Sequence, residues 1–226
     1  EYRRQRQMCI RDSLNSALKG VKENGILGIA ATDTAVLCGA KPSVCKERYG
    51  AVSMKKVAAK EVGVRILLAK IHNLASKMER GIEPILCYSE GHHLRVFVKI
   101  IKTVKEKLGW LTNDMRVSRN KENGSAGPLW TGKIIDESMV PTFEKGILKR
   151  MLETLREEAE GPPGLYDIND LSKAAEIGQT PQRTKIIESI RKLGCFASSS
   201  VFSPLGVKTD ATGDVRIQAV KLAQSL

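Results

Sequence analysis

One short apolar run constrains the fold of this chain more than any other stretch. Ile26–Ala31 has the sequence ILGIAA and is bounded by Gly25 and by the polar triplet Thr32, Asp33 and Thr34. An uninterrupted apolar run of this length is typical of a fully buried strand inside a parallel sheet. Because ligand crevices in open α/β sheets lie beyond the carboxyl ends of the strands, the triplet is expected to face a site. The alternative, that Asp33 or Thr34 only caps the following turn or helix, stays open.

The run leads into the first of several stretches that resemble one enzyme family. They occur in the same order as in that family and cover nearly everything from about Leu14 onward: ATDTAVLCG with KPSVCKERYGA, GIEPILCYSEGHHLRVFVKI, GPLWTGKI and FSPLGVKTDA. Together they resemble the tRNA (guanine-26-N2)-dimethyltransferases. The resemblance implies an α/β fold with a class I, Rossmann-like methyltransferase domain and an additional C-terminal domain.

The resemblance also implies a reaction, a cofactor and a partner. Members transfer methyl groups from S-adenosyl-L-methionine to the exocyclic N2 of a guanosine in tRNA, and that base must leave its stack to be reached. By position, Thr32, Asp33 and Thr34 correspond to the active-site rim and bind substrate. We expect Asp33 to hydrogen-bond guanine or its neighbours rather than to act as the main base.

The chain departs from the family pattern in one respect. The family's cofactor-binding and catalytic motifs precede the matching residues, and the sequence contains no Gly-X-Gly. We therefore expect a C-terminal part that lacks the cofactor-binding N-terminal part and is inactive alone. Roughly a hundred or more further coding residues, with a glycine-rich strand-loop-helix, are predicted upstream.

The charge of the chain favours a nucleic-acid partner. The sequence has 37 Lys and Arg against 25 Asp and Glu, a net charge of +12, which attracts polyanions through phosphate contacts and counterion release. No apolar run approaches the length of a membrane span, so no membrane association is predicted. Five scattered cysteines without a CxxC pair are typical of reduced thiols in the cytoplasm. Nothing in the sequence indicates an obligate protein partner.

Metal binding is not expected. Many members of the family place paired cysteines for a structural zinc before the C-terminal domain, but this chain has no cysteine between Cys87 and Cys195. His92 and His93 are adjacent, and neighbouring side chains on an extended chain point in opposite directions, so they are poorly placed to share an ion. We predict no zinc and no other metal.

Three parts are predicted along the chain. Residues 1–13 match nothing in the family and are expected to be a lead that is not native to the gene, with a basic RNA-binding arm as the alternative. Residues 14–136 form the partial methyltransferase domain, and residues 137–226 form a winged-helix-like, tRNA-binding domain.

Hydrophobic periodicity predicts the elements of the methyltransferase domain. The helix over 53–80 is expected to have Ser53 as its N-cap and His72 at its surface or boundary. The remaining elements are a helix over 14–22, a buried strand over 26–31, a hairpin of strands 83–89 and 94–102, a polar connection over 102–126 and a short strand over 133–135.

The C-terminal part has the outline of a winged helix. After a helix that starts near Pro141, two shorter helices end near Ile177 and Leu193, and a strand over 195–201 and a loop over 202–210 follow. Cations of the second short helix and of the loop are predicted to contact tRNA phosphates: Arg183, Lys185, Arg191, Lys192 and Lys208. The alternative function is a winged-helix nucleic-acid-binding protein, regulatory or tRNA-binding, without catalysis.

Overall fold

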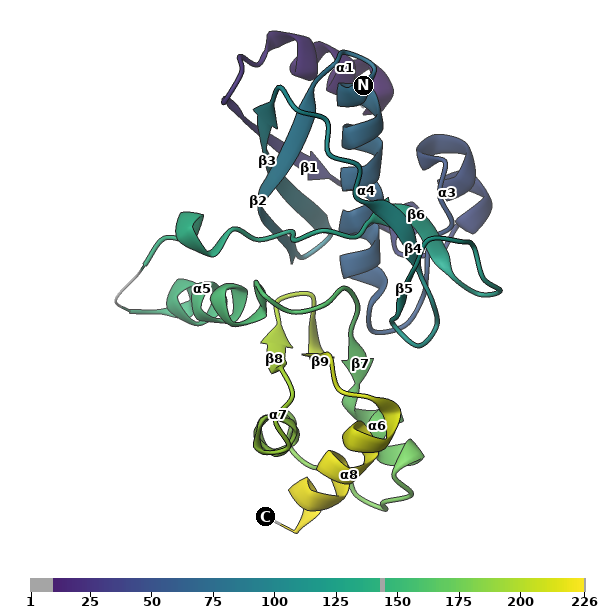
Figure 1. Ribbon diagram of the computed structural model, residues 1–226, viewed down its shortest axis with the longest axis vertical. Helices are drawn as coiled ribbons and strands as arrows, with labels where there is room; N and C mark the ends of the chain where they lie inside the picture. The colour runs from purple at the N-terminus through teal and green to yellow at the C-terminus, as the bar shows by residue number, and fades with distance from the viewer. Residues whose placement is uncertain (1–9, 143–144, 226) are drawn as a thin grey trace, which may run out of the picture.

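The computed structural model describes residues 10–142 and 145–225, with the N-terminal elements at one end and the C-terminal helices at the other (Figure 1). The N-terminal elements are α1 (Ile10–Gly20), β1 (Ile26–Ala31), α2 (Thr34–Leu37), α3 (Pro42–Tyr49), α4 (Ala59–Ser76), β2 (Gly81–Glu90), β3 (His93–Ile101), β4 (Leu108–Leu111), β5 (Val117–Ser118) and β6 (Ala126–Trp130). The C-terminal elements are η1 (Glu137–Met139), α5 (Ile147–Glu158), β7 (Tyr166–Asp167), α6 (Ile168–Ala174), α7 (Arg183–Lys192), β8 (Ala197–Ser200), β9 (Ser203–Thr209) and α8 (Gly213–Gln224).

The first sheet is antiparallel and has the order β1-β3-β2. The predicted hairpin of β2 and β3 is confirmed. The prediction of a fully buried strand between parallel neighbours is wrong for the described residues, because β1 pairs only with β3, and antiparallel. Alternate side chains of β1 point to opposite faces, so Leu27 and Ala31 are buried whereas Ile26 is 54% exposed.

Helix α4 is the central element of this part, and it packs against β2, β3 and β6. The predicted N-cap at Ser53 is wrong, since the helix begins at Ala59. The segment before it is held extended, because the amides and carbonyls of Val52 and Gly127 exchange two hydrogen bonds of 2.7 and 2.8 Å. That bridge ties the chain to β6 before the helix can start.

The prediction of His72 as a surface or boundary residue is also wrong. His72 is 4% exposed, and its ring lies 5.6 Å from that of Trp130. The reason is that α4 is covered on two sides, by the first sheet and by β6 of the second, so its face opposite the sheet is also buried.

A second small sheet, in the order β5-β4-β6, lies beside α4. β4 and β5 fall in the stretch over 102–126 that was expected to be only a polar connection. The strand predicted over 133–135 does not form. Trp130 Nε1 donates to the Lys133 carbonyl at 3.0 Å, which bends the chain, and only the Asp136 amide bonds to β2, at the Ile85 carbonyl.

The C-terminal part consists of a third antiparallel sheet, β7-β9-β8, with α6, α7 and α8 packed together beneath it in Figure 1. The two short helices and the strand after them are confirmed near their predicted bounds. Helix α5 begins at Ile147 instead of Pro141, after Gly146 at a φ of 94°. The predicted loop over 202–210 is largely strand β9, and α8 was not predicted.

Two hydrophobic cores hold the molecule together. One contains residues of the first two sheets, α4 and α5, and also Leu165 and Phe202 from the C-terminal part. The other lies among α6, α7, α8 and the third sheet, around Ile186 and Ile190. The first core therefore spans the predicted boundary at residues 136 and 137. Of the predicted lead, residues 1–9 lie outside the described residues, whereas residues 10–13 already belong to α1.

Candidate functional site

The polar triplet follows β1 directly, as the sequence predicts. Asp33 occupies the N-cap position of α2, but its side chain makes no capping hydrogen bond. The backbone carbonyl of Asp33 instead accepts from the amides of Val36 and Leu37, at 3.1 and 3.0 Å. Thr32 is exposed and Thr34 is half-buried at the start of α2. Capping therefore does not explain why a carboxylate stands at this position.

The Asp33 carboxylate is held by Arg48 of α3. Arg48 Nη1 lies 2.9 Å from Asp33 Oδ2, and the two side chains are 48% and 19% exposed. Beside them, Tyr49 is buried and its hydroxyl has no hydrogen-bond partner among the described residues. Burial raises the pKa of the Tyr49 hydroxyl and the charge of Asp33 raises it further, so the phenol is neutral. The rim thus offers a carboxylate and a guanidinium, with a buried phenol close to both.

Two cysteines lie near this rim, in the loop and helix that follow β1. Burial raises the pKa of the Cys38 thiol to about 11, and burial also raises the pKa of Cys45. A thiol acts as a nucleophile or metal ligand only as the thiolate. Neither cysteine is therefore suited to direct chemistry at neutral pH.

The predicted RNA-binding cations of α7 fall into two groups. Lys185 and Lys192 are seven residues apart, so they share one face of the helix, two turns or about 10 Å apart along its axis. Arg183 and Arg191 are engaged with the protein, since Arg183 Nη1 donates to the Ser203 carbonyl at 3.3 Å and Arg191 Nε to the Ala197 carbonyl at 2.8 Å. The two lysines are the side chains best placed to contact phosphates.

Lys208 does not lie on this surface, contrary to the prediction. Its side chain is 2% exposed, and its Nζ lies 2.9 Å from Glu61 Oε1 on α4. The ammonium also donates to the Pro162 carbonyl at 3.0 Å. Lys208 was predicted to be in a loop, but it lies on strand β9 and points into the interface with α4, where no phosphate reaches it.

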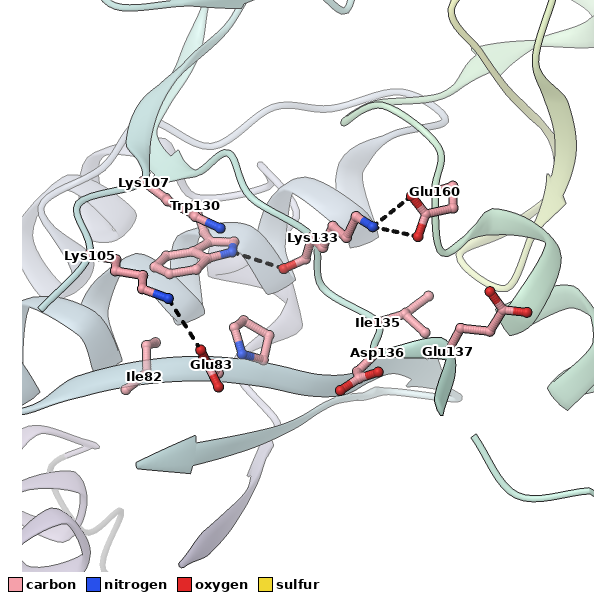
Figure 2. Close-up of a pocket in the computed structure, with 11 residues that line it drawn as sticks. Ile82, Glu83, Lys105, Lys107, Trp130, Lys133, Ile135, Asp136, Glu137 and Glu160 are labelled. Atoms are coloured by element: carbon pink, nitrogen blue, oxygen red, sulfur yellow. Dashed lines mark hydrogen bonds and ion pairs between the residues drawn. The ribbon is translucent and has the colours of Figure 1, made fainter. Parts of the chain in front are cut away.

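A cavity of about 370 Å³ opens elsewhere, at the start of β2 (Figure 2). Apolar side chains of Ile82 and Trp130 line it together with charges of both signs: Lys105, Lys107, Lys133, Glu83, Asp136, Glu137 and Glu160. Lys105 pairs with Glu83, and Lys133 with Glu160, as the dashed lines in Figure 2 show.

This cavity is separate from the rim. Ile82 pairs opposite Ile100 of β3 whereas Ala31 pairs opposite Leu94, which is roughly 20 Å along the strand. Its paired charges give it no strong preference for either sign of ligand.

Within residues 10–142 and 145–225, no group of three or more His, Cys, Asp or Glu side chains is gathered as a metal site. The absence of zinc stays a prediction. A helix long and apolar enough to cross a bilayer is likewise missing from the described part of the chain.

Comparison with known proteins identifies the family. The family described as N2,N2-dimethylguanosine tRNA methyltransferase matches this chain over residues 11–117 and 105–221. The chain belongs to this family. The match begins within the predicted lead of residues 1–13, so at least residues 11–13 align with the family.

Relatives in the N2,N2-dimethylguanosine tRNA methyltransferase family include archaeal proteins. The tRNA (guanine(26)-N(2))-dimethyltransferase of Pyrococcus abyssi is 34% identical over 93% of this chain and 62% of its own length. That of Thermoplasma acidophilum is 29% identical over 89% of this chain and 59% of its own. The chain thus spans about 60% of the length of these relatives.

A solved structure also resembles this one. It is the complex of Trm1 from Pyrococcus horikoshii with S-adenosyl-L-methionine, with a TM-score of 0.81 and 31% identity. The similarity covers 92% of this chain and 62% of the solved chain. The mixed α/β fold is therefore shared with a member of the family.

Sequence reasoning missed Glu61 and Glu158, which are buried at 0% and 3% exposure. Helix α4 was interpreted only as an apolar stripe. A usable signal was present, because Glu61 and Arg65 are four residues apart in the otherwise apolar stretch over 61–69, where isolated charges are costly. Nothing comparable in the sequence distinguishes Glu158.

Proposed function

We propose that this chain is the C-terminal, tRNA-holding part of a tRNA (guanine-26-N2)-dimethyltransferase. The complete enzyme transfers methyl groups from S-adenosyl-L-methionine to the exocyclic N2 of a guanosine in tRNA, in the cytoplasm. The observation that carries this proposal is the family match, which runs from residue 11 to residue 221. The net charge of +12 fits a polyanionic substrate.

The first sheet supports the assignment of the N-terminal part, to about residue 136, to a class I methyltransferase domain. Such sheets end in an antiparallel hairpin, and here β2 and β3 form one beside β1. The other edge of β1 carries no strand within the described residues and is the place where further strands of the domain would pair. Thr32, Asp33 and Thr34 then lie at the crevice between β1 and its next neighbour.

The residues present do not fit the cofactor by themselves. A dinucleotide-like ligand in an open α/β sheet is held by a glycine-rich strand-to-helix turn and an acidic strand end. β1 is followed by Thr32 and Asp33, not by such a turn, and the neighbouring strand that would complete the crevice is not among the described residues. We propose that the part of the relatives not covered here holds the cofactor, whereas this chain supplies the rim and the RNA contacts.

The C-terminal part supports an RNA-binding role. The order of α5, β7, α6, α7, β8 and β9 with the sheet order β7-β9-β8 has the outline of a winged helix, in which the second helix of the turn contacts nucleic acid. On that helix, Lys185 and Lys192 share one face, whereas Arg183 and Arg191 donate to the Ser203 and Ala197 carbonyls. The two lysines form the proposed tRNA surface.

The second candidate is a winged-helix nucleic-acid-binding protein without catalysis, which the same helix α7 favours. Binding of the 226-residue chain to tRNA and to duplex DNA of equal charge, at matched salt, separates the two. The enzyme proposal predicts at least roughly tenfold tighter binding to tRNA. Equal or tighter binding to the DNA would favour the second candidate.

A further inference from the structure

The C-terminal part is connected to α4 by a buried ionic contact between residues far apart in sequence. Lys208 of β9 and Glu61 of α4 are 147 positions apart, and Nζ and Oε1 lie 2.9 Å apart. Glu61 Oε1 also accepts from Arg65 Nε at 2.8 Å and from the Gly164 amide at 3.2 Å. One carboxylate oxygen therefore binds one group of its own helix and two groups of the C-terminal part.

This contact is rigidly supported on both sides. Arg65 Nη1 donates to the carbonyls of Trp130 and Gly132, at 3.0 and 2.8 Å, which anchors the Glu61 side. On the other side, a Cβ added to Gly161 would lie 2.2 Å from Lys208 Cδ, so only a glycine lets the lysine stem pass. The neighbouring groups therefore restrict both side chains to the arrangement in which they pair.

Burial makes the Glu61–Lys208 contact sensitive to the alignment of the two side chains. Both side chains are almost completely buried, and the adjacent cavity, lined by Arg65, Glu158 and Lys208, measures only about 10 Å³. A buried ion pair gains little stability over apolar side chains of the same volume, but a misaligned one leaves an uncompensated charge. Such a pair favours one arrangement of the two parts over slightly rotated ones.

We propose that Glu61 and Lys208 are positioning residues that fix the angle between the methyltransferase part and the C-terminal part. This rests on the proposed function, in which the α7 surface and the Asp33 rim must engage one tRNA together. With the angle fixed, binding at one surface presents the RNA to the other at a high effective concentration. When the angle is free, each surface binds on its own.

The test uses Lys208→Met in the 226-residue chain, since Arg65 still pairs with Glu61 in this variant. The matched control is Lys221→Met, which removes the same charge from an exposed lysine of α8. Residual dipolar couplings of amides in α4 and α7 are expected to fit one alignment tensor in the wild type and the control, and to require two in Lys208→Met. Affinity for whole tRNA should fall roughly tenfold in Lys208→Met alone. Affinity for an RNA duplex too short to reach beyond α7 should stay unchanged.

A single alignment tensor in Lys208→Met overturns the proposal, whatever the affinities show. If that variant does not fold, Gly161→Ala gives the same test, because it keeps the charge and displaces the lysine stem. A wild type that does not prefer tRNA to the short duplex would contradict the proposed function instead, and the couplings would still decide the positioning role.

Discussion

The Asp33 carboxylate is 19% exposed, makes no helix cap and is held by Arg48 at 2.9 Å. An exposed ion pair of this kind contributes about 0–1 kcal/mol, so it does not account for the fold. A carboxylate fixed at the end of a strand is suited to accept hydrogen bonds from an amine such as guanine N2–H.

In a version extended to the full length of the relatives, Asp33→Ala is therefore expected to lower methyl transfer to tRNA by roughly ten- to a hundredfold. The unfolding free energy should change by less than about 1 kcal/mol. Arg48→Ala is the control, because it breaks the same ion pair and leaves the carboxylate. Equal losses in both variants would mean that the ion pair, not the carboxylate, matters.

Glu158 gives the structure a pH dependence. Burial raises its pKa from 4.5 to about 7, against the lowering effect of nearby Lys208. A carboxyl with a raised pKa binds more protons when folded, so the unfolding free energy falls as the pH rises from about 4.5 to about 7. At about 1.36 kcal/mol per pH unit, the loss is roughly 3 kcal/mol.

The Glu158→Gln variant should lack this loss. Urea unfolding of both proteins at about pH 5 and about pH 8 measures it, and the difference between the proteins isolates Glu158. Glu61 affects stability in a different pH range. Burial alone would raise its pKa, but Lys208 and Arg65 hold that pKa at about 2. The contribution of Glu61 to the unfolding free energy is therefore lost only as the pH falls below about 4.5. If the unfolding free energies of the two proteins depend on pH in the same way, burial does not raise the pKa of Glu158.

At the residue scale, the local sequence did not predict which polar side chains are buried. Lysine is almost never fully buried unless paired, so the expectation of an exposed Lys208 followed the general rule. Its partner Glu61 is 147 positions away, and only the tertiary arrangement brings the two together. The prediction of His72 at the surface or boundary was wrong for the same reason, since its neighbour Trp130 comes from a sheet that was not predicted.

At the element scale, strongly periodic segments were predictable and short strands were not. The hairpin of β2 and β3, and the helices α6 and α7, carry alternation or caps that can be recognised locally, such as Asp167, which accepts from the Asn169 amide. β4 and β5 are short and polar at their ends, and β9 contains Pro204 and Gly206, which both disfavour a strand assignment.

Helix α7 is the element whose role is most directly testable. Lys185→Ala combined with Lys192→Ala in the 226-residue chain should lower the slope of log affinity for tRNA against log salt by about 2, with little change in sequence preference. Lys173→Ala and Lys221→Ala together, on α6 and α8, remove the same charge from exposed positions and should leave the slope nearly unchanged. Coincident slopes for wild type and the α7 variant would mean that this helix does not touch RNA.

At the scale of the whole molecule, the two parts are coupled more tightly than the sequence suggested. The first core takes Leu165 and Phe202 from beyond the predicted boundary, and the Glu61–Lys208 pair crosses it. The resemblance found in the sequence anticipated the family correctly, and its motifs lie in stretches that form α2 and α3, the β2–β3 hairpin, β6 and β9. How the parts pack could not be predicted, since no local pattern encodes a contact between distant segments.

The reaction we propose for the full-length protein is methyl transfer to the guanosine at position 26 of tRNA. The most direct measurement uses the chain extended to the relatives' full length, labelled S-adenosyl-L-methionine, and two tRNAs that differ only in guanosine or adenosine at that position. We expect label in the guanosine tRNA and none above background in the adenosine tRNA, because only guanine presents the exocyclic N2. Equal labelling of both tRNAs, or no labelling of a tRNA that is demonstrably bound, would contradict the account.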